Sequence, residues 1–238
     1  MRKERIYQSR RHLLITLLIL VVPFIFLLVF SRFINEITLG ELLKDVGISF
    51  LRLSIAYFIA VSLGWLLAVS FYHGRRAIIA LPLFDVLQSL PTFAALPLAT
   101  YLWGPSGVTV ILFLVVTIIW PIFFSIISSL KLIRRDWEEV VKMTKLRGLT
   151  YLKNFLWPVT FPALVTGSIV GLGEGWEALV ATEIIVKVKT GLGQFFGLFV
   201  QNTTITALGI LGFLIFIFSI NKVIWLPLLE WSHRKMEE

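Results

Sequence analysis

Three glutamates, Glu174, Glu177 and Glu183, interrupt an otherwise apolar stretch at residues 158–186. A carboxylate in the hydrocarbon core of a membrane is costly unless it faces water or a charged partner, so such residues are candidates for a role in solute or ion passage. Glu174 and Glu177 are three residues apart and would share one face of a helix with Ala181. We therefore expect the acids of this stretch to line a translocation path.

A structural role is the alternative for the same acids. The first two glutamates could pair with Arg52 or Lys222, which interrupt other apolar stretches. Glu183 precedes Lys187 by about one helical turn, which allows an ion pair at the end of the stretch as readily as a path role. Small side chains leave room for an aqueous lumen, and four glycines favour the path: Gly167, Gly171, Gly173 and Gly175.

Composition places these acids in a membrane protein. The chain of 238 residues is 58% hydrophobic and 15% charged, with a mean hydropathy of +0.89. A soluble domain has roughly 45–50% apolar and about 25% charged residues. The absence of cysteine excludes disulfides, thiolate zinc sites and cysteine nucleophiles. With no phosphate-binding loop or serine-nucleophile motif, we expect no enzymatic activity, cofactor or metal.

Six stretches have the length needed to cross a bilayer, whose core of about 30 Å requires roughly 20 apolar residues in a helix. We expect an all-α, polytopic membrane protein with a single domain over residues 1–238. The third stretch contains three prolines, which predict an approach segment followed by a kinked span. The stretches are residues 13–30, 48–72, 77–103, 108–130, 158–186 and 205–229.

The distribution of basic residues predicts the orientation. Sixteen Lys and Arg residues fall on the side of both termini and of the 131–157 connection, and four fall on the other side. Since basic loops stay in the cytoplasm, both termini are expected inside the cell. The net charge of +8 then follows from topology, and we expect no nucleic-acid partner.

The connection at residues 131–157 is amphipathic. Asp136 could cap a helix, with Glu139 three residues later, and Gly148 permits a turn after it. A solvated loop, or a segment lying on lipid headgroups, would have a similar composition. The expected helix would carry a narrow apolar stripe formed by Trp137, Val140, Val141 and Thr144.

The stretch EEVVKMTKLRGLTYLKNFLWPVTFPALVTG resembles the EAA loop of ABC importer permeases, which carries a Glu-Ala-Ala motif, a glycine and a leucine-proline pair. Aligned from Pro158, Glu139 falls on the family glutamate and Lys145 on the glycine. Another register places Gly148 on the glycine and Lys142 on the glutamate.

Three further stretches resemble permeases of the sulfonate, taurine and nitrate importer group, so that the core resemblance covers about residues 48–230. They are ISFLRLSIAYFIAVSLG, LQSLPTFAALPLATYLWG and WEALVATEIIVKVKTGLGQFF. The last contains Glu183, which matches a glutamate common in that group, and the turn Gly191-Leu192-Gly193.

The resemblance implies a type I ABC importer (MetI-like) transmembrane domain in the inner membrane of a bacterium or archaeon. Such a permease is a homodimer that forms the path for a small solute, handed over by an external binding protein, and two separate subunits hydrolyse ATP. An ion-coupled carrier or channel that uses the intramembrane glutamates is the alternative function. The residues implied in coupling to the ATPase are Glu139, Val140, Val141, Thr144, Lys145, Gly148 and Pro158.

Overall fold

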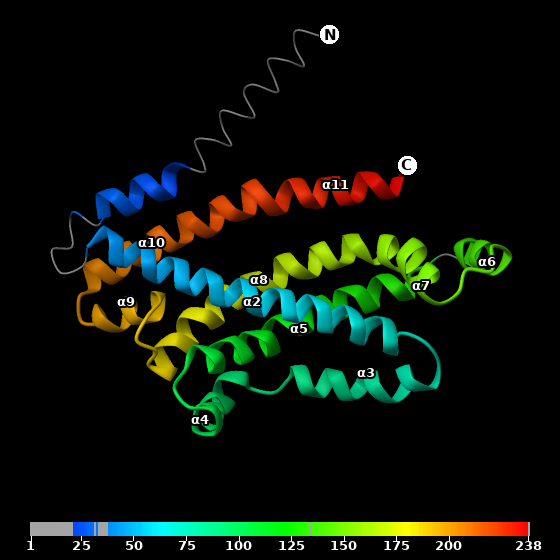
Figure 1. Cartoon of the computed structure of the whole chain (residues 1–238), viewed down its shortest axis with the longest axis horizontal. Coiled ribbons are helices and arrows are strands. Elements are labelled where there is room, and N and C mark those ends of the chain that lie inside the picture. Colours follow the sequence, from blue (N-terminus) through cyan, green and yellow to red (C-terminus); the bar gives the residue numbers. More distant parts are fainter. Residues whose placement is uncertain (1–20, 31, 33–37, 134, 238) are drawn as a thin grey trace, which may run out of the picture.

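The computed structural model of the chain describes residues 21–30, 32, 38–133 and 135–237. These residues form helices joined by turns, and the part described contains no strand, which confirms the all-α prediction. The longer helices run roughly along the long axis of the molecule, with α6 at one end and α9 at the other (Figure 1). In chain order the elements are α2 (Leu39–Phe71), α3 (Gly74–Gln88), α4 (Thr92–Trp103), α5 (Gly107–Lys131), α6 (Arg135–Met143), α7 (Gly148–Tyr151), the π-turn η1 (Leu152–Leu156), α8 (Trp157–Val186), α9 (Leu192–Leu198), α10 (Thr203–Ile220), the π-turn η2 (Asn221–Trp225) and α11 (Leu226–Glu237).

Four helical stretches are long and apolar enough to cross a membrane, and they agree with the second, fourth, fifth and sixth predicted spans. Of the predicted span at 13–30, the described residues contain the second part, residues 21–30, which form the short apolar helix Val21–Phe30. The number of six spans and the orientation of the chain in the membrane therefore remain predictions. The four stretches are Leu39–Phe71, Gly107–Lys131, Gly148–Val186 and Thr203–Ser232.

The predicted third span is a sharply bent pair of helices. The axes of α3 and α4 meet at 86° across a short break. Pro91 occupies the position before the first residue of α4, and a proline disfavours helical geometry in the residue that precedes it. Pro82 and Pro97 lie inside α3 and α4, which continue through them. The bend therefore occurs at one of the three prolines that predicted it.

The polar residues at the helix starts explain where two of the spans begin. Thr38 and Glu41 form a capping box at the start of α2, in which each side chain accepts a hydrogen bond from the other residue's backbone N–H. Ser106 accepts the Thr109 N–H at the start of α5. These side chains satisfy backbone donors that have no partner within the helix.

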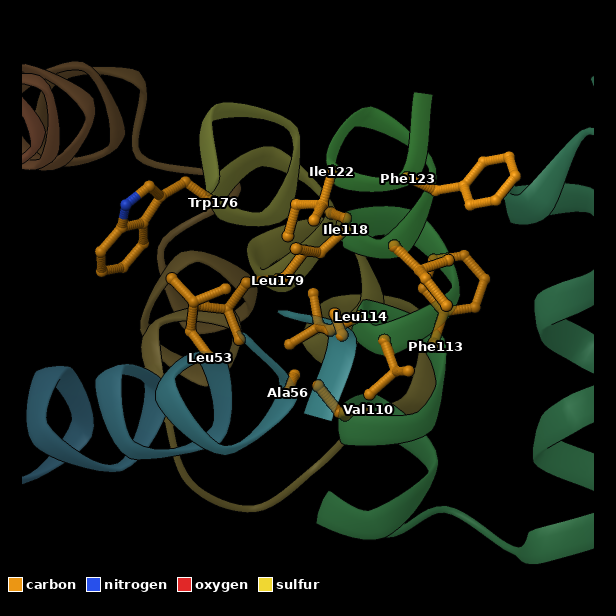
Figure 2. Close-up of a cluster of buried hydrophobic side chains, with 14 of the residues drawn as sticks. Leu53, Ala56, Val110, Phe113, Leu114, Ile118, Ile122, Phe123, Trp176 and Leu179 are labelled. Atoms are coloured by element: carbon orange, nitrogen blue, oxygen red, sulfur yellow. The ribbon is translucent and has the colours of Figure 1, made fainter. Parts of the chain in front are cut away.

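Helix α5 is the centre of the packed core. α2 packs on one side of α5 and α8 on another, and the buried side chains of all three helices converge there (Figure 2). Leu114, Ile118 and Ile122 of α5 are completely buried. Leu53 of α2 and Leu179 of α8 approach them from the two neighbouring helices. The three helices therefore share one apolar core.

Glycines allow α8 to lie directly against α5. A Cβ atom at Gly167 would lie 2.8 Å from the Ile122 Cα, and one at Gly171 would lie 3.0 Å from the Ile118 carbonyl oxygen. With Gly175 they form a small-residue row at four-residue spacing, which brings two helix backbones together in membranes. The expectation that these glycines open a lumen is therefore wrong, because α5 fills the space beside them. Gly173 alone among the four has open space at this position.

Replacing Gly167 by alanine is expected to destabilise the protein, because its methyl group would overlap the α5 backbone. Overpacking of this kind costs about 1–3 kcal/mol. Gly173→Ala is the matched control, since it adds the same methyl group to the same helix in open space and gains helix propensity. Thermal unfolding in detergent measures both variants. Equal melting temperatures for the two variants would contradict the close α5–α8 contact.

Candidate functional site

One face of α8 is left open by its neighbours and carries two of the predicted acids. Glu174 and Glu177 are both exposed, as are Gly173 and Val170 on the same side of the helix. Neither carboxylate forms a hydrogen bond or ion pair within the described part of the chain. Lys222 lies exposed in η2. The alternative of a structural pair with Arg52 or Lys222 is therefore not realised for these two acids.

Glu183 has a different environment, because it is completely buried. Its carboxylate forms an ion pair with Arg52 of α2, whose side chain is 12% exposed. The hydroxyl of Ser49, also buried, lies 2.8 and 2.9 Å from the two carboxylate oxygens. The Gly193 N–H donates to the same carboxylate at 2.9 Å. Each oxygen of Glu183 is thus satisfied, which is the condition for keeping a charge out of water.

The beginning of α9 is held by the same side chains. Three successive backbone N–H groups, of Gly191, Leu192 and Gly193, donate to Asp45, Ser49 and Glu183 respectively. Arg52 completes the arrangement by donating to the carbonyl and hydroxyl oxygens of Thr190. Two carboxylates therefore lie at the positive end of α9, where negative charge is favourable. We call the group Asp45, Ser49, Arg52, Glu183, Thr190, Gly191 and Gly193 the corner network.

The two glycines of the corner network explain the turn that the sequence showed there. Gly191 has φ = 115°, and a Cβ atom on it would lie 2.6 Å from a Glu183 carboxylate oxygen. A Cβ atom on Gly193 would lie 2.3 Å from the Glu183 Cβ. Any side chain at these two positions would displace the carboxylate from the backbone N–H groups.

The expected partner and the expected position of Glu183 are both corrected. Its cation is Arg52 and not Lys187, which ends α8 in a left-handed conformation with φ = 57° and points away as an exposed residue. Since no part of Glu183 is exposed, it lines no open surface of the chain. The sequence suggests Arg52 as a partner for Glu174 or Glu177 and not for Glu183. The signal that could have found it is the i, i+3 spacing of Ser49 and Arg52, which puts both on one helical face.

Helix α6 projects from the end of the molecule opposite α9 (Figure 1). The prediction of a short helix here is confirmed, although it begins at Arg135, so that Asp136 lies in its first turn and is not the cap. The predicted apolar stripe divides between two sides: Trp137 and Val141 are half-buried, whereas Val140 is 56% exposed. The stripe expected on one side of α6 therefore serves two surfaces.

Val141 faces the rest of the molecule across a cavity of about 250 Å³. Tyr72 and His73, at the end of α2, line this cavity together with Tyr151 of α7. Tyr72 and Tyr151 are joined by a hydrogen bond of 3.1 Å between their hydroxyl groups. The other side of α6 presents Glu139, Val140 and Met143, the last 82% exposed.

Pro158 lies near the start of α8, directly after the π-turn η1. A proline has no N–H to donate to the preceding helical turn. The wider η1 turn, in which the Trp157 N–H donates to the Leu152 carbonyl, lets the helix continue from α7 into α8 without interruption. Pro158 and the face that carries Glu174 therefore belong to one continuous helix.

Residues 60–225 match the family described as binding-protein-dependent transport system inner membrane component. This range is more than half of the chain and contains α5, α6 and α8. The chain belongs to this family.

Relatives within the family transport different small solutes according to their names. The nitrate import permease protein NrtB of Leptolyngbya laminosa is 31% identical over 153 residues, 64% of this chain and 52% of NrtB. The bicarbonate transport system permease protein CmpB of Synechococcus elongatus is 27% identical over 60% of this chain and 50% of its own. The taurine transport system permease protein TauC of Escherichia coli is 25% identical over 74% of this chain and 66% of its own. The matched part spans about half the length of the cyanobacterial relatives.

The turn after α6 can be compared with the position of the family glycine. Lys145, on which the family glycine falls in the register aligned from Pro158, has φ = 49° and lies two residues after Met143, the last residue of α6. A left-handed residue at this position ends many helices and is usually glycine. Gly148 is also left-handed, with φ = 57°, but it starts α7. The geometry thus favours the register with Glu139 on the family glutamate.

Replacing Lys145 by glycine is expected to stabilise the end of α6, because a left-handed conformation costs a residue with a Cβ about 1–2 kcal/mol. Backbone hydrogen exchange over residues 135–145, followed by mass spectrometry in detergent, should slow in Lys145→Gly. Lys142→Gly, within the same helix, should accelerate it, because glycine weakens a helix interior by about 1 kcal/mol. Faster exchange in Lys145→Gly would show that the turn has another conformation.

Proposed function

We propose that the chain is the membrane-spanning permease subunit of an ATP-driven importer. The observation that carries the proposal is α6, a short helix within the family match that projects from the spanning helices and exposes apolar side chains at one end of the molecule. In the proposed importer, the permease receives energy from another protein, because separate subunits hydrolyse ATP.

The exposed side of α6 is the proposed docking surface for the ATPase. Val140 and Met143 of α6 are 56% and 82% exposed, and Leu149 of the adjoining α7 is 83% exposed. Apolar side chains outside the bilayer gain free energy when a partner covers them. Glu139 and Lys145 add opposite charges beside them. This end carries the excess of basic loop residues, which supports its placement in the cytoplasm.

The open face of α8 is the proposed wall of the translocation path. Lipid cannot solvate Glu174 and Glu177, so their face requires water or a second protein surface. Asp85 and Gln88 of α3 are likewise exposed between apolar residues. A second copy of the chain would enclose such faces in a shared aqueous path, which supports a homodimer.

The names of the relatives suggest the class of solute. Nitrate, bicarbonate and taurine are small and carry an anionic group, and we propose that this chain passes a small solute of that kind, a sulfonate or a related organic compound, from an external binding protein. Glu174 and Glu177 would repel a purely anionic solute in the path. Their presence favours a zwitterion such as taurine over nitrate.

An ion-coupled carrier is the second candidate function, and the same two acids favour it. Acidic residues without a partner within a membrane can bind protons or sodium ions. Dependence on ATP separates the two functions. Uptake into proteoliposomes that persists when the ATPase is inactive would favour the carrier.

The docking proposal predicts that Val140→Asp prevents assembly with the ATPase and lowers taurine or nitrate uptake, because a charge replaces an apolar contact. A loss of about tenfold or more is expected if Val140 is central to the interface. Val200→Asp is the matched control, since Val200, 66% exposed against 56% for Val140, is an exposed valine at the opposite end of the molecule. The chain has no native cysteine, so Met143→Cys gives a single crosslinking position. Failure of that cysteine to crosslink an ATPase in native membranes would contradict the proposal.

The path proposal predicts that Glu174→Gln and Glu177→Gln change uptake and leave the melting temperature unaltered, because neither carboxylate holds the fold together. Loss of one charge changes the interaction with an ionic solute by roughly 1 kcal/mol or more in a narrow aqueous path. Initial rates for taurine and nitrate should shift in opposite directions if the acids select between them. A fall in stability with unchanged uptake would instead indicate a structural role.

A further inference from the structure

We infer that α2 and α8 are fixed to each other by a ladder of hydrogen bonds and that the two helices, with α5 between them, act as one rigid lever from the α6 end to the α9 end. The role of this lever, which is to carry motion from the docking surface across the membrane, rests on the proposed function. The rigid connection between the helices does not depend on that role.

Two rungs of the ladder lie in the middle of the spans. The Tyr57 hydroxyl bonds the buried hydroxyl of Ser168 at 3.0 Å. About two helical turns further along α2, the Trp65 ring N–H donates to the buried Thr160 hydroxyl at 2.9 Å. Because α2 and α8 run in opposite directions, the residue number rises along one helix as it falls along the other. Each rung therefore fits only one register of the two helices.

The ends of the ladder are the two contacts already described for the site. At the α9 end, Ser49 and Arg52 of α2 bind Glu183 of α8. At the α6 end, Tyr72 and Tyr151 share a hydrogen bond. Side-chain contacts thus join α2 and α8 at three levels, and a fourth contact joins Tyr72, directly after α2, to Tyr151 of α7, which is continuous with α8. A single joint would permit rotation, whereas several joints at different depths prevent it.

The backbone packing explains why long side chains form the rungs. α5 contacts both α2 and α8 closely, and the row of glycines lets α8 approach it. The two outer helices of this group are consequently held apart, and tyrosine, tryptophan and arginine can span the interval. The ladder closes the third side of the α2–α5–α8 group. Lipid exerts little force that would pull these helices together, so packing and hydrogen bonds carry the association.

The α6 end of the ladder faces the proposed docking element across one cavity. Val141 of α6 lines the same cavity as Tyr72 and Tyr151. A displacement of α6 toward the spans would therefore press on the rung formed by Tyr72 and Tyr151. Because the group is rigid, the displacement would appear at the α9 end as movement of the whole corner.

The corner network is the most extensively hydrogen-bonded of the joints, and it contains the buried charge pair. Removing one partner of such a pair leaves the other charge without compensation, whereas neutralising both removes the penalty. The network also fixes α9 through Gly191 and Gly193. Arg52, Ser49 and Glu183 are thus positioning residues for the outer end of α8, and they act without contacting the solute.

Distances between spin labels test the ladder in the isolated chain, which has no native cysteine. Labels at Lys44→Cys and Lys189→Cys, both exposed, report on the α9 end. A narrow distance distribution is expected in lipid nanodiscs, widening about twofold or more in Glu183→Gln and Arg52→Gln, since each leaves a buried partner unsatisfied. The double variant Arg52→Gln/Glu183→Gln should be narrower than either single variant. Asp85→Asn, an acid outside the ladder, should leave the distribution unchanged.

A second pair of labels tests the rung at the α6 end separately from the corner network. Labels at the exposed Ser70 and Asn154 report on the α6 end, and Glu183→Gln should leave their distribution unchanged while Tyr72→Phe widens it. Ser49→Ala, which retains the charge pair, serves if the charge variants do not fold, and should widen the first distribution less. An unaltered first distribution in Glu183→Gln or, in its place, Ser49→Ala overturns the ladder.

The assembled transporter tests the purpose of the lever. With ATPase and binding protein reconstituted, Glu183→Gln should lower taurine uptake per ATP hydrolysed about fivefold, while ATP hydrolysis per assembled complex stays near the wild-type rate. Poor folding alone would lower total uptake and total ATP hydrolysis in proportion and leave uptake per ATP hydrolysed unchanged, and that result would overturn a positioning role. If wild-type uptake proves independent of ATP, the proposed function fails while the label distances still decide the ladder.

Discussion

A carboxylate without access to water is the constraint that organises the α9 end of the molecule. Glu183 is completely buried, and a buried charge is tolerated only with a counter-charge and a full set of hydrogen bonds. Arg52 supplies the charge, Ser49 a hydroxyl and Gly193 a backbone donor. These groups come from two other helices, so α2 and α9 must both be placed before α8 can end where it does.

The helical period then decides what α8 presents elsewhere. Positions two residues apart lie about 200° apart around a helix, so a residue two positions after a packed glycine points to the opposite side. Gly171 and Gly175 lie against α5, while Gly173 and Glu177 are exposed. The same packing that brings α8 close to α5 thus leaves the acidic face uncovered.

Much of the fold could be predicted because hydropathy and proline reflect constraints that act locally. The second and fourth to sixth spans, the helix of the 131–157 connection and the bend near Pro91 all follow from the local sequence. Partners from distant parts of the chain could not be predicted. Nothing near Glu183 indicates that its cation lies 131 residues away, and the sequence alone cannot tell a glycine that opens a lumen from one that admits another helix.

The polar contacts between α2 and α8 resolve a problem that apolar packing leaves open. In lipid, two apolar helices can slide past each other at little cost, because their side chains resemble the surrounding hydrocarbon. A hydrogen bond such as that between Trp65 and Thr160 forms in one register, and its loss leaves polar atoms unsatisfied in a medium that offers no substitute. Hydrogen bonds of modest strength therefore select one arrangement of the helices. A protein that must move as a unit needs this selectivity more than it needs additional stability.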